Sequence, residues 1–98
     1  GVDPHEAPKL LAACLALPHV RVRGLMTMAP QGDLQVARAV FDDLARLHSR
    51  LRAGLEPQAA AVFDGLSMGM SEDWREAVAA GATIVRIGRA VFSDAFEA

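Results

Sequence analysis

Apolar residues recur at steps of three and four along the middle of the chain. They stand at Ala37, Val40, Phe41, Leu44, Leu47 and Leu51. The positions between them carry the charged residues Arg38, Asp42, Asp43, Arg46 and Arg50. This spacing predicts a long amphipathic helix with Asp33 as its N-cap and Gly54 closing it as the C′ residue. Asp42 and Arg46 stand four residues apart, which favours an ion pair on the helix surface.

Shorter patterns flank this helix on both sides. Residues 8–16 predict a helix that Pro18 ends. The predicted strands are residues 20–26, 60–67 and 83–87. The first of them alternates valine with arginine and then becomes wholly apolar, as a strand does when it enters a covered sheet. Between the second and third strands, Ser71 is predicted to cap a short helix that buries Trp74, Ala77 and Val78. A last helix is predicted to begin at Arg89.

Strict alternation of helices and strands predicts βα units and a parallel sheet with helical cover. Parallel strands are normally paired on both edges, and three strands would leave the outer edges bare. A complete doubly wound domain would need about five strands. We therefore predict an α/β fold in which residues 1–98 are the C-terminal βα units of a (β/α)8 TIM barrel, a portion of one domain.

Two glycine turns follow the last two predicted strands, at residues 67–71 and 86–89. Loops after the last strands of such barrels often bind phosphate, because glycine lets backbone N–H groups approach an anion. The first turn runs into Glu72 and Asp73, which would repel a phosphate. Gly88 and its neighbours include no acid, so the second turn is predicted to carry the anion, with the hydroxyl of Ser67 added from the first.

Composition narrows the class of protein. The chain has 98 residues, 52% hydrophobic and 22% charged, with a mean hydropathy of +0.21, which argues for a packed core and against disorder. A net charge of −2 predicts no nucleic-acid or membrane partner. One cysteine, Cys14, excludes an internal disulfide, and no paired Cys or His spacing predicts a metal site. No apolar run is long enough to span a bilayer and no signal peptide is evident, so a cytoplasmic globular protein is expected.

Two segments carry a family resemblance. LSMGMSEDWREAVAAGATIVRIGRAVF, residues 66–92, closely resembles the C-terminal signature of the YggS/PROSC family of pyridoxal 5′-phosphate (PLP) homeostasis proteins. RVRGLMTMAP, residues 21–30, resembles a more central segment of that family. The resemblance implies a barrel like the N-terminal domain of alanine racemase, with PLP held as a Schiff base by a lysine near the first strand. The only lysine here, Lys9, does not match it, so that lysine is expected upstream and is absent from this chain.

The resemblance also implies the roles of individual residues. Ser67, Gly88 and Arg89 would hold the phosphate, and Arg86 would approach the pyridine nitrogen. A guanidinium cannot give up its proton, so it disfavours the pyridinium form and weakens the ring as an electron sink. The family usually has threonine where this chain has Arg89, so Arg89 either replaces a neutral contact with a charge-assisted one or points into solvent. Two methionines at strand ends, Met26 and Met68, either face the cofactor or pack in the core.

These implications predict a PLP-binding protein of intracellular PLP homeostasis, a carrier or regulator with no catalytic residue, whose partners are PLP and PLP-dependent apoenzymes. A PLP-dependent racemase-like enzyme is the first alternative; it needs an acid/base residue opposite the lysine, and this chain has no tyrosine. A cofactor-free barrel remnant is the second. The three histidines, His5, His19 and His48, are expected on the surface or on a helix face, and Cys14 is expected as a small buried hydrophobe.

Overall fold

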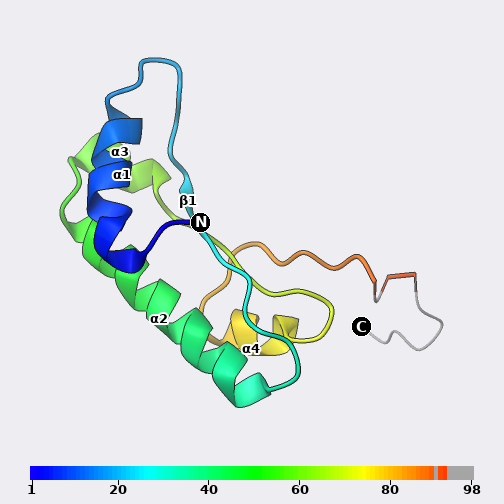
Figure 1. The fold of residues 1–98 in the computed structure, drawn as a ribbon. Coiled ribbons are helices and arrows are strands. Elements are labelled where there is room, and N and C mark those ends of the chain that lie inside the picture. Colours follow the sequence, from blue (N-terminus) through cyan, green and yellow to red (C-terminus); the bar gives the residue numbers. More distant parts are fainter. Residues whose placement is uncertain (90, 93–98) are drawn as a thin grey trace.

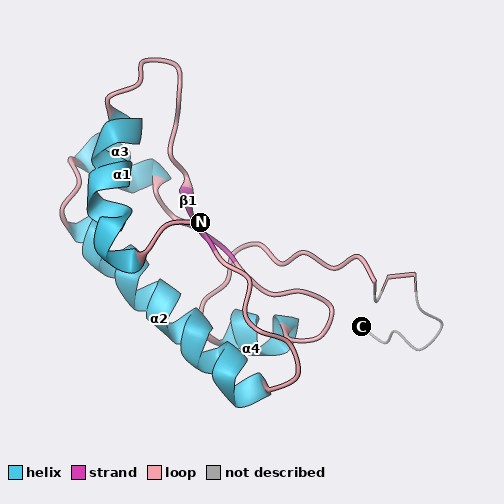
Figure 2. Cartoon of the chain, in the orientation of Figure 1, coloured by secondary structure: helices cyan, strands magenta, loops and turns pink. Residues whose placement is uncertain are grey.

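Helices cover one side of a small parallel sheet in the computed structural model, which describes residues 1–89, 91 and 92 (Figures 1 and 2). In chain order the elements are the 3₁₀ helix η1 (Pro4–Glu6), α1 (Ala7–Leu15), β1 (Gly24–Met26), α2 (Leu34–Ala53), α3 (Pro57–Val62), β2 (Gly65–Ser67) and α4 (Trp74–Ala79). Strands β1 and β2 pair in parallel. A single parallel bridge between Ser67 and Ile84 brings the segment after α4 alongside β2.

Two glycines allow the strands to begin pairing closely. Gly24 lies opposite Gly65 in the register, and the amide of Gly65 donates to the carbonyl of Arg23 at 2.7 Å. A Cβ on Gly24 would lie 1.9 Å from the carbonyl oxygen of Gly65. Only glycine fits this approach of one backbone to the other.

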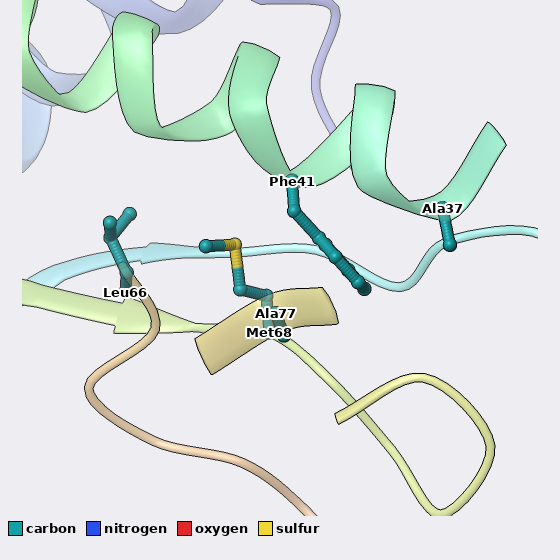
Figure 3. Close-up of a cluster of buried hydrophobic side chains, with 5 residues drawn as sticks. All are labelled: Ala37, Phe41, Leu66, Met68 and Ala77. Atoms are coloured by element: carbon teal, nitrogen blue, oxygen red, sulfur yellow. The ribbon is translucent and has the colours of Figure 1, made fainter. Parts of the chain in front are cut away.

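Helix α2 organises the core. Its N-cap is Asp33, whose Oδ1 accepts from the amides of Gln35 and Val36 at 2.9 and 3.2 Å, so the predicted start is confirmed. Gly54 ends the helix as its C-cap, one position from the predicted C′. The cluster of fully or almost fully buried side chains comprises Ala37, Phe41, Leu66, Met68 and Ala77. Figure 3 shows Ala37 and Phe41 pointing from α2 toward the strand and α4. Helix α2 therefore covers one face of the sheet.

The second half of α2 holds the chain that leads into β2. His48 is buried, and its Nε2 lies 2.9 Å from the carbonyl oxygen of Phe63, to which it donates. The two rings stack with their centroids 4.8 Å apart. His48 therefore lies on a face of α2, one of the two predicted positions. It is buried there because the chain folds back and places Phe63, also fully buried, against the helix. His5 and His19 are exposed as predicted, and Cys14 is half-buried.

The predicted strands lie where the structure pairs the chain, but they were predicted too long. Only the last three residues of 20–26 form β1. In residues 60–67, the first three belong to α3, which Pro57 begins and a run of three alanines continues. Residues 83–87 meet β2 through the bridge at Ile84 without a strand of their own.

Helix α4 begins later than predicted. Its N-cap is Asp73, not Ser71, and the Oδ1 of Asp73 accepts from the amide of Met70 at 2.8 Å, which closes the turn before the helix. Ala77 is buried as predicted, whereas Val78 is exposed and Trp74 half-buried. The helix predicted after Arg89 falls largely on residues 90 and 93–98, outside the described residues.

Charged residues tie α2 to α4. Arg38 pairs with Asp42 at 3.2 Å and reaches Glu76 on α4 at 3.5 Å, and these two carboxylates, Asp42 foremost, raise the pKa of Arg38. Arg46 pairs with Asp43, so the predicted pair between Asp42 and Arg46 is wrong. On the helix surface Asp42 pairs with Arg38, and Arg46 pairs with Asp43.

Candidate functional site

The sheet has one covered face and one open face. Leu25 and Leu66, which are register partners, belong to the core against α2. Alternation along a strand turns the neighbouring pair, Met26 and Ser67, to the other face. A cavity of about 300 Å³ lies there, lined by both of these residues and by Ile84. This face of the sheet, away from the helices, is called the open face, and in the predicted barrel it points to the interior.

The carboxyl ends of β1, of β2 and of the segment around Ile84 lie side by side. The amide of Thr27 donates to the carbonyl of Ser67 at 3.1 Å, and the amide of Met68 donates to the carbonyl of Ile84 at 3.0 Å. Because all three segments run in parallel, their carboxyl ends meet at one edge of the sheet. The predicted site residues Met26, Ser67 and Arg86 come together at this edge.

Arg86 spans that edge with two hydrogen bonds to the backbone. Its amide donates to the carbonyl of Gly69 at 2.9 Å, and its Nη2 donates to the carbonyl of Thr27 at 2.8 Å. Its Nε is buried and has no hydrogen-bond partner among the described residues. A buried donor without a partner costs free energy, so this guanidinium is suited to an additional acceptor.

Gly88 and Arg89 follow on an exposed turn. A Cβ built on Gly88 would meet no atom within 4 Å. The space beside Gly88 is therefore open on the side where a side chain would stand.

The two methionines differ in position. Met26 is 61% exposed on the open face, whereas Met68 has no exposed surface. Met68 is part of the core cluster with Phe41 and Ala77. The prediction that Met68 faces a cofactor is thus corrected to its alternative, a packing role, because its side chain points to the helices.

Two residues that the sequence patterns did not single out, Thr27 and Thr83, shape the site together with Gly69 of the first glycine turn. Thr27 and Gly69 supply the carbonyls that hold Arg86, and a backbone acceptor leaves no signature in sequence. Thr83 fixes the register of the segment before Arg86, because its Oγ1 accepts from the amide of Leu66 at 2.8 Å and donates to the carbonyl of Leu66 at 3.4 Å. In the sequence, the only sign of this role is that Thr83 stands at the start of an apolar run.

Within residues 1–89, 91 and 92 the structure shows neither a metal site nor a membrane-spanning helix. No group of three or more His, Cys, Asp or Glu side chains lies close enough together to bind a metal ion. None of the helices in these ranges is long and apolar enough to cross a membrane.

Comparison with known proteins places this geometry in context. Residues 1–95 match the family described as the alanine racemase N-terminal domain. The chain is 44% identical over 93 residues to a pyridoxal phosphate homeostasis protein of Deinococcus radiodurans, covering 95% of this chain and 39% of that protein. It is 40% identical over 92 residues to the protein of the same name from Escherichia coli K12, covering 94% and 38%. The chain therefore spans about two fifths of the length of these relatives.

Two solved structures are also similar to this chain. PipY of Synechococcus elongatus, a COG0325 family member solved with PLP bound, superposes with a TM-score of 0.81 at 37% sequence identity. The match covers 95% of this chain and 43% of that one. A protein from Bifidobacterium adolescentis superposes with a TM-score of 0.84 at 35% identity, covering 94% of this chain and 36% of that one.

Proposed function

The chain belongs to the alanine racemase N-terminal domain family, and from this membership we propose that it forms part of a PLP site in a protein of intracellular PLP homeostasis. Its share of the site is the phosphate-binding edge and the partner of the pyridine nitrogen. The name shared by its relatives, pyridoxal phosphate homeostasis protein, and the PLP bound to PipY support the choice of ligand.

The observation that carries the proposal is the state of Arg86. Its guanidinium is fixed by the carbonyl of Thr27 and retains a buried Nε donor without a partner among the described residues. It lies at the edge where the segments of Ser67 and Gly88 end. One donor for a ring nitrogen and several for a phosphate are thus present at one edge of the sheet.

The phosphate would be held by donors of three kinds. The turn at Gly88 offers backbone N–H groups, Ser67 a hydroxyl, and Arg89 a guanidinium. Hydrogen bonds in which one partner is charged are about twice as strong as neutral ones. The exposed Met26 would cover the ring from the open face, a role for which its polarizable thioether is suited.

The chemistry of Arg86 favours a carrier over an enzyme. Bound PLP supplies an electron sink when its pyridine nitrogen is protonated. An arginine has only donors to offer and stays protonated in proteins. It therefore stabilises the unprotonated nitrogen, and the ring withdraws electrons poorly. This polarity supports the proposed non-catalytic role, in which PLP is held and passed to PLP-dependent apoenzymes.

The test measures PLP affinity of the protein expressed from its full coding sequence. Gly88→Asp should weaken binding by at least about tenfold, since its carboxylate repels the phosphate and keeps it from the backbone donors of the turn. The fold should persist, because the new Cβ meets nothing within 4 Å. Equilibrium dialysis with PLP measures the affinity, and circular dichroism checks the fold.

Gly54→Asp is the matched control. It adds the same charge at the exposed end of α2, where a Cβ would meet only the carbonyl of Leu51 at 3.7 Å, and it should leave PLP affinity unchanged. Equal affinities of wild type and Gly88→Asp would place the phosphate elsewhere. Absence of PLP binding by the wild-type protein would overturn the proposed function.

A further inference from the structure

We propose that Gly69 is a positioning residue for Arg86, and that no residue with a side chain can replace it without displacing the guanidinium. This inference rests on the proposed function, because its consequence for a ligand concerns the pyridine nitrogen of PLP. Gly69 lies in the turn between β2 and α4 and is buried.

Gly69 has a conformation and surroundings that both require glycine. Its φ is +101°, a region that residues with a Cβ rarely adopt. A Cβ at this position would lie 2.7 Å from the Cβ of Ala77, 3.2 Å from the Cα of Trp74 and 3.2 Å from a methyl group of Val85. The glycine thus fills a narrow space between α4 and the segment that enters the site.

The atoms crowded against Gly69 include the neighbour of Arg86 in the chain. Val85, whose methyl group would be contacted, is the residue before it. The carbonyl of Gly69 accepts the amide of Arg86 at 2.9 Å, while Nη2 of Arg86 donates to Thr27 at 2.8 Å. The first bond fixes the main chain of Arg86 and the second its side chain. A Cβ on Gly69 pushes the turn away from Val85 and so weakens the first bond.

A second glycine of this chain separates backbone strain from this contact. Gly32 has a φ of +99°, and a Cβ there would meet no atom within 4 Å. Gly32→Ala therefore carries the same conformational cost as Gly69→Ala without the steric contact, in the loop before α2. Gly32→Ala is therefore the control in each measurement made on Gly69→Ala.

The first measurement needs no cofactor. Hydrogen exchange of the Arg86 amide is followed by NMR in the protein expressed from its full coding sequence. Gly69→Ala should speed this exchange, relative to the amides of α2, by on the order of tenfold, as expected for the loss of one backbone hydrogen bond. Gly32→Ala should leave it unchanged. Unaltered protection of Arg86 in a folded Gly69→Ala protein would overturn the proposal.

The second measurement uses the absorption spectrum of bound PLP. Gly69→Ala should shift the spectrum because the guanidinium no longer meets the ring nitrogen squarely. The same change made in an Arg86→Gln protein should produce no additional shift, since the residue through which Gly69 acts is gone. Equal shifts in both backgrounds would show that Gly69 acts by another route and would overturn the proposal.

A second variant covers the case in which Gly69→Ala does not fold. Ala77→Gly, combined with it, removes the atom nearest to the added Cβ. The strain at residue 69 and the contact with Val85 remain, so a smaller increase in Arg86 exchange is expected. Wild-type exchange in this folded pair would refute the inference. Failure of the wild-type protein to bind PLP would instead refute the proposed function, while the exchange measurement still decides the role of Gly69.

Discussion

At the ring-nitrogen end of the proposed site, the electrostatic character depends on Arg86 and on what it does not contact. Its partners are the carbonyls of Thr27 and Gly69, and none of the ion pairs in the described part of the chain involves it. A carbonyl orients a guanidinium without neutralising it, whereas a carboxylate would have done both. The positive charge of Arg86 therefore remains available to a ligand.

Arg86→Glu should reverse the preference of the ring nitrogen. A carboxylate accepts a hydrogen bond from a protonated nitrogen, so the pyridinium form of bound PLP should become more stable and the absorption spectrum should shift. Arg75→Glu is the control, because Arg75 is exposed and lies over the ring of Trp74 on α4, 4.5 Å from its centroid. It carries the same change of charge and should leave the spectrum as in the wild type. A folded Arg86→Glu protein with an unchanged spectrum would mean that Arg86 has only a structural role.

Among the elements, those with a strong local pattern were predictable and those that depend on distant partners were not. Helix α2 has its cap, its apolar stripe and its final glycine in one continuous segment, so its bounds follow from the sequence. The strands are three residues each, and their ends are set by pairing with other strands. The burial of His48 likewise depends on Phe63, fifteen residues further along the chain.

Phe41→Ala should test how far the sheet depends on α2. Phe41 is fully buried between the helix and the strands, so its truncation should lower the free energy of unfolding by about 3–5 kcal/mol. Val36→Ala, at a position of the same helix that is 43% exposed, should change it by about 0.5 kcal/mol or less. Urea denaturation of both variants measures the difference. Similar midpoints for the two would contradict the view that α2 holds the sheet through Phe41.

Across the whole molecule, the family resemblance of residues 66–92 predicted the fold class and the family, which hydrophobic patterning alone could not do. The family match and the superposition on PipY confirm the predicted fold class, a part of the alanine racemase N-terminal domain barrel, and the named relatives confirm the YggS/PROSC resemblance. Patterning indicated parallel βα units, yet it could not assign the two faces of the sheet to Met26 and Met68. That assignment requires the register of β1 on β2, which short strands do not encode locally.

Lys9 provides the last prediction, which is that it forms no specific covalent link with PLP. It is the only lysine of the chain, and it is exposed on α1. In Figure 1, α1 lies beside α2 on the left, whereas the chain after α4 runs toward the right. In a barrel the helices pack outside the strands, so the ammonium group should be on the outer wall. Borohydride reduction of the 98-residue chain with PLP, followed by mass mapping, should label Lys9 no more than the α-amino group of Gly1. Lys9→Arg in the protein expressed from its full coding sequence should retain PLP as the wild type does. Stoichiometric labelling of Lys9 that inorganic phosphate suppresses would contradict the prediction, because it would place this amine within reach of the turn at Gly88.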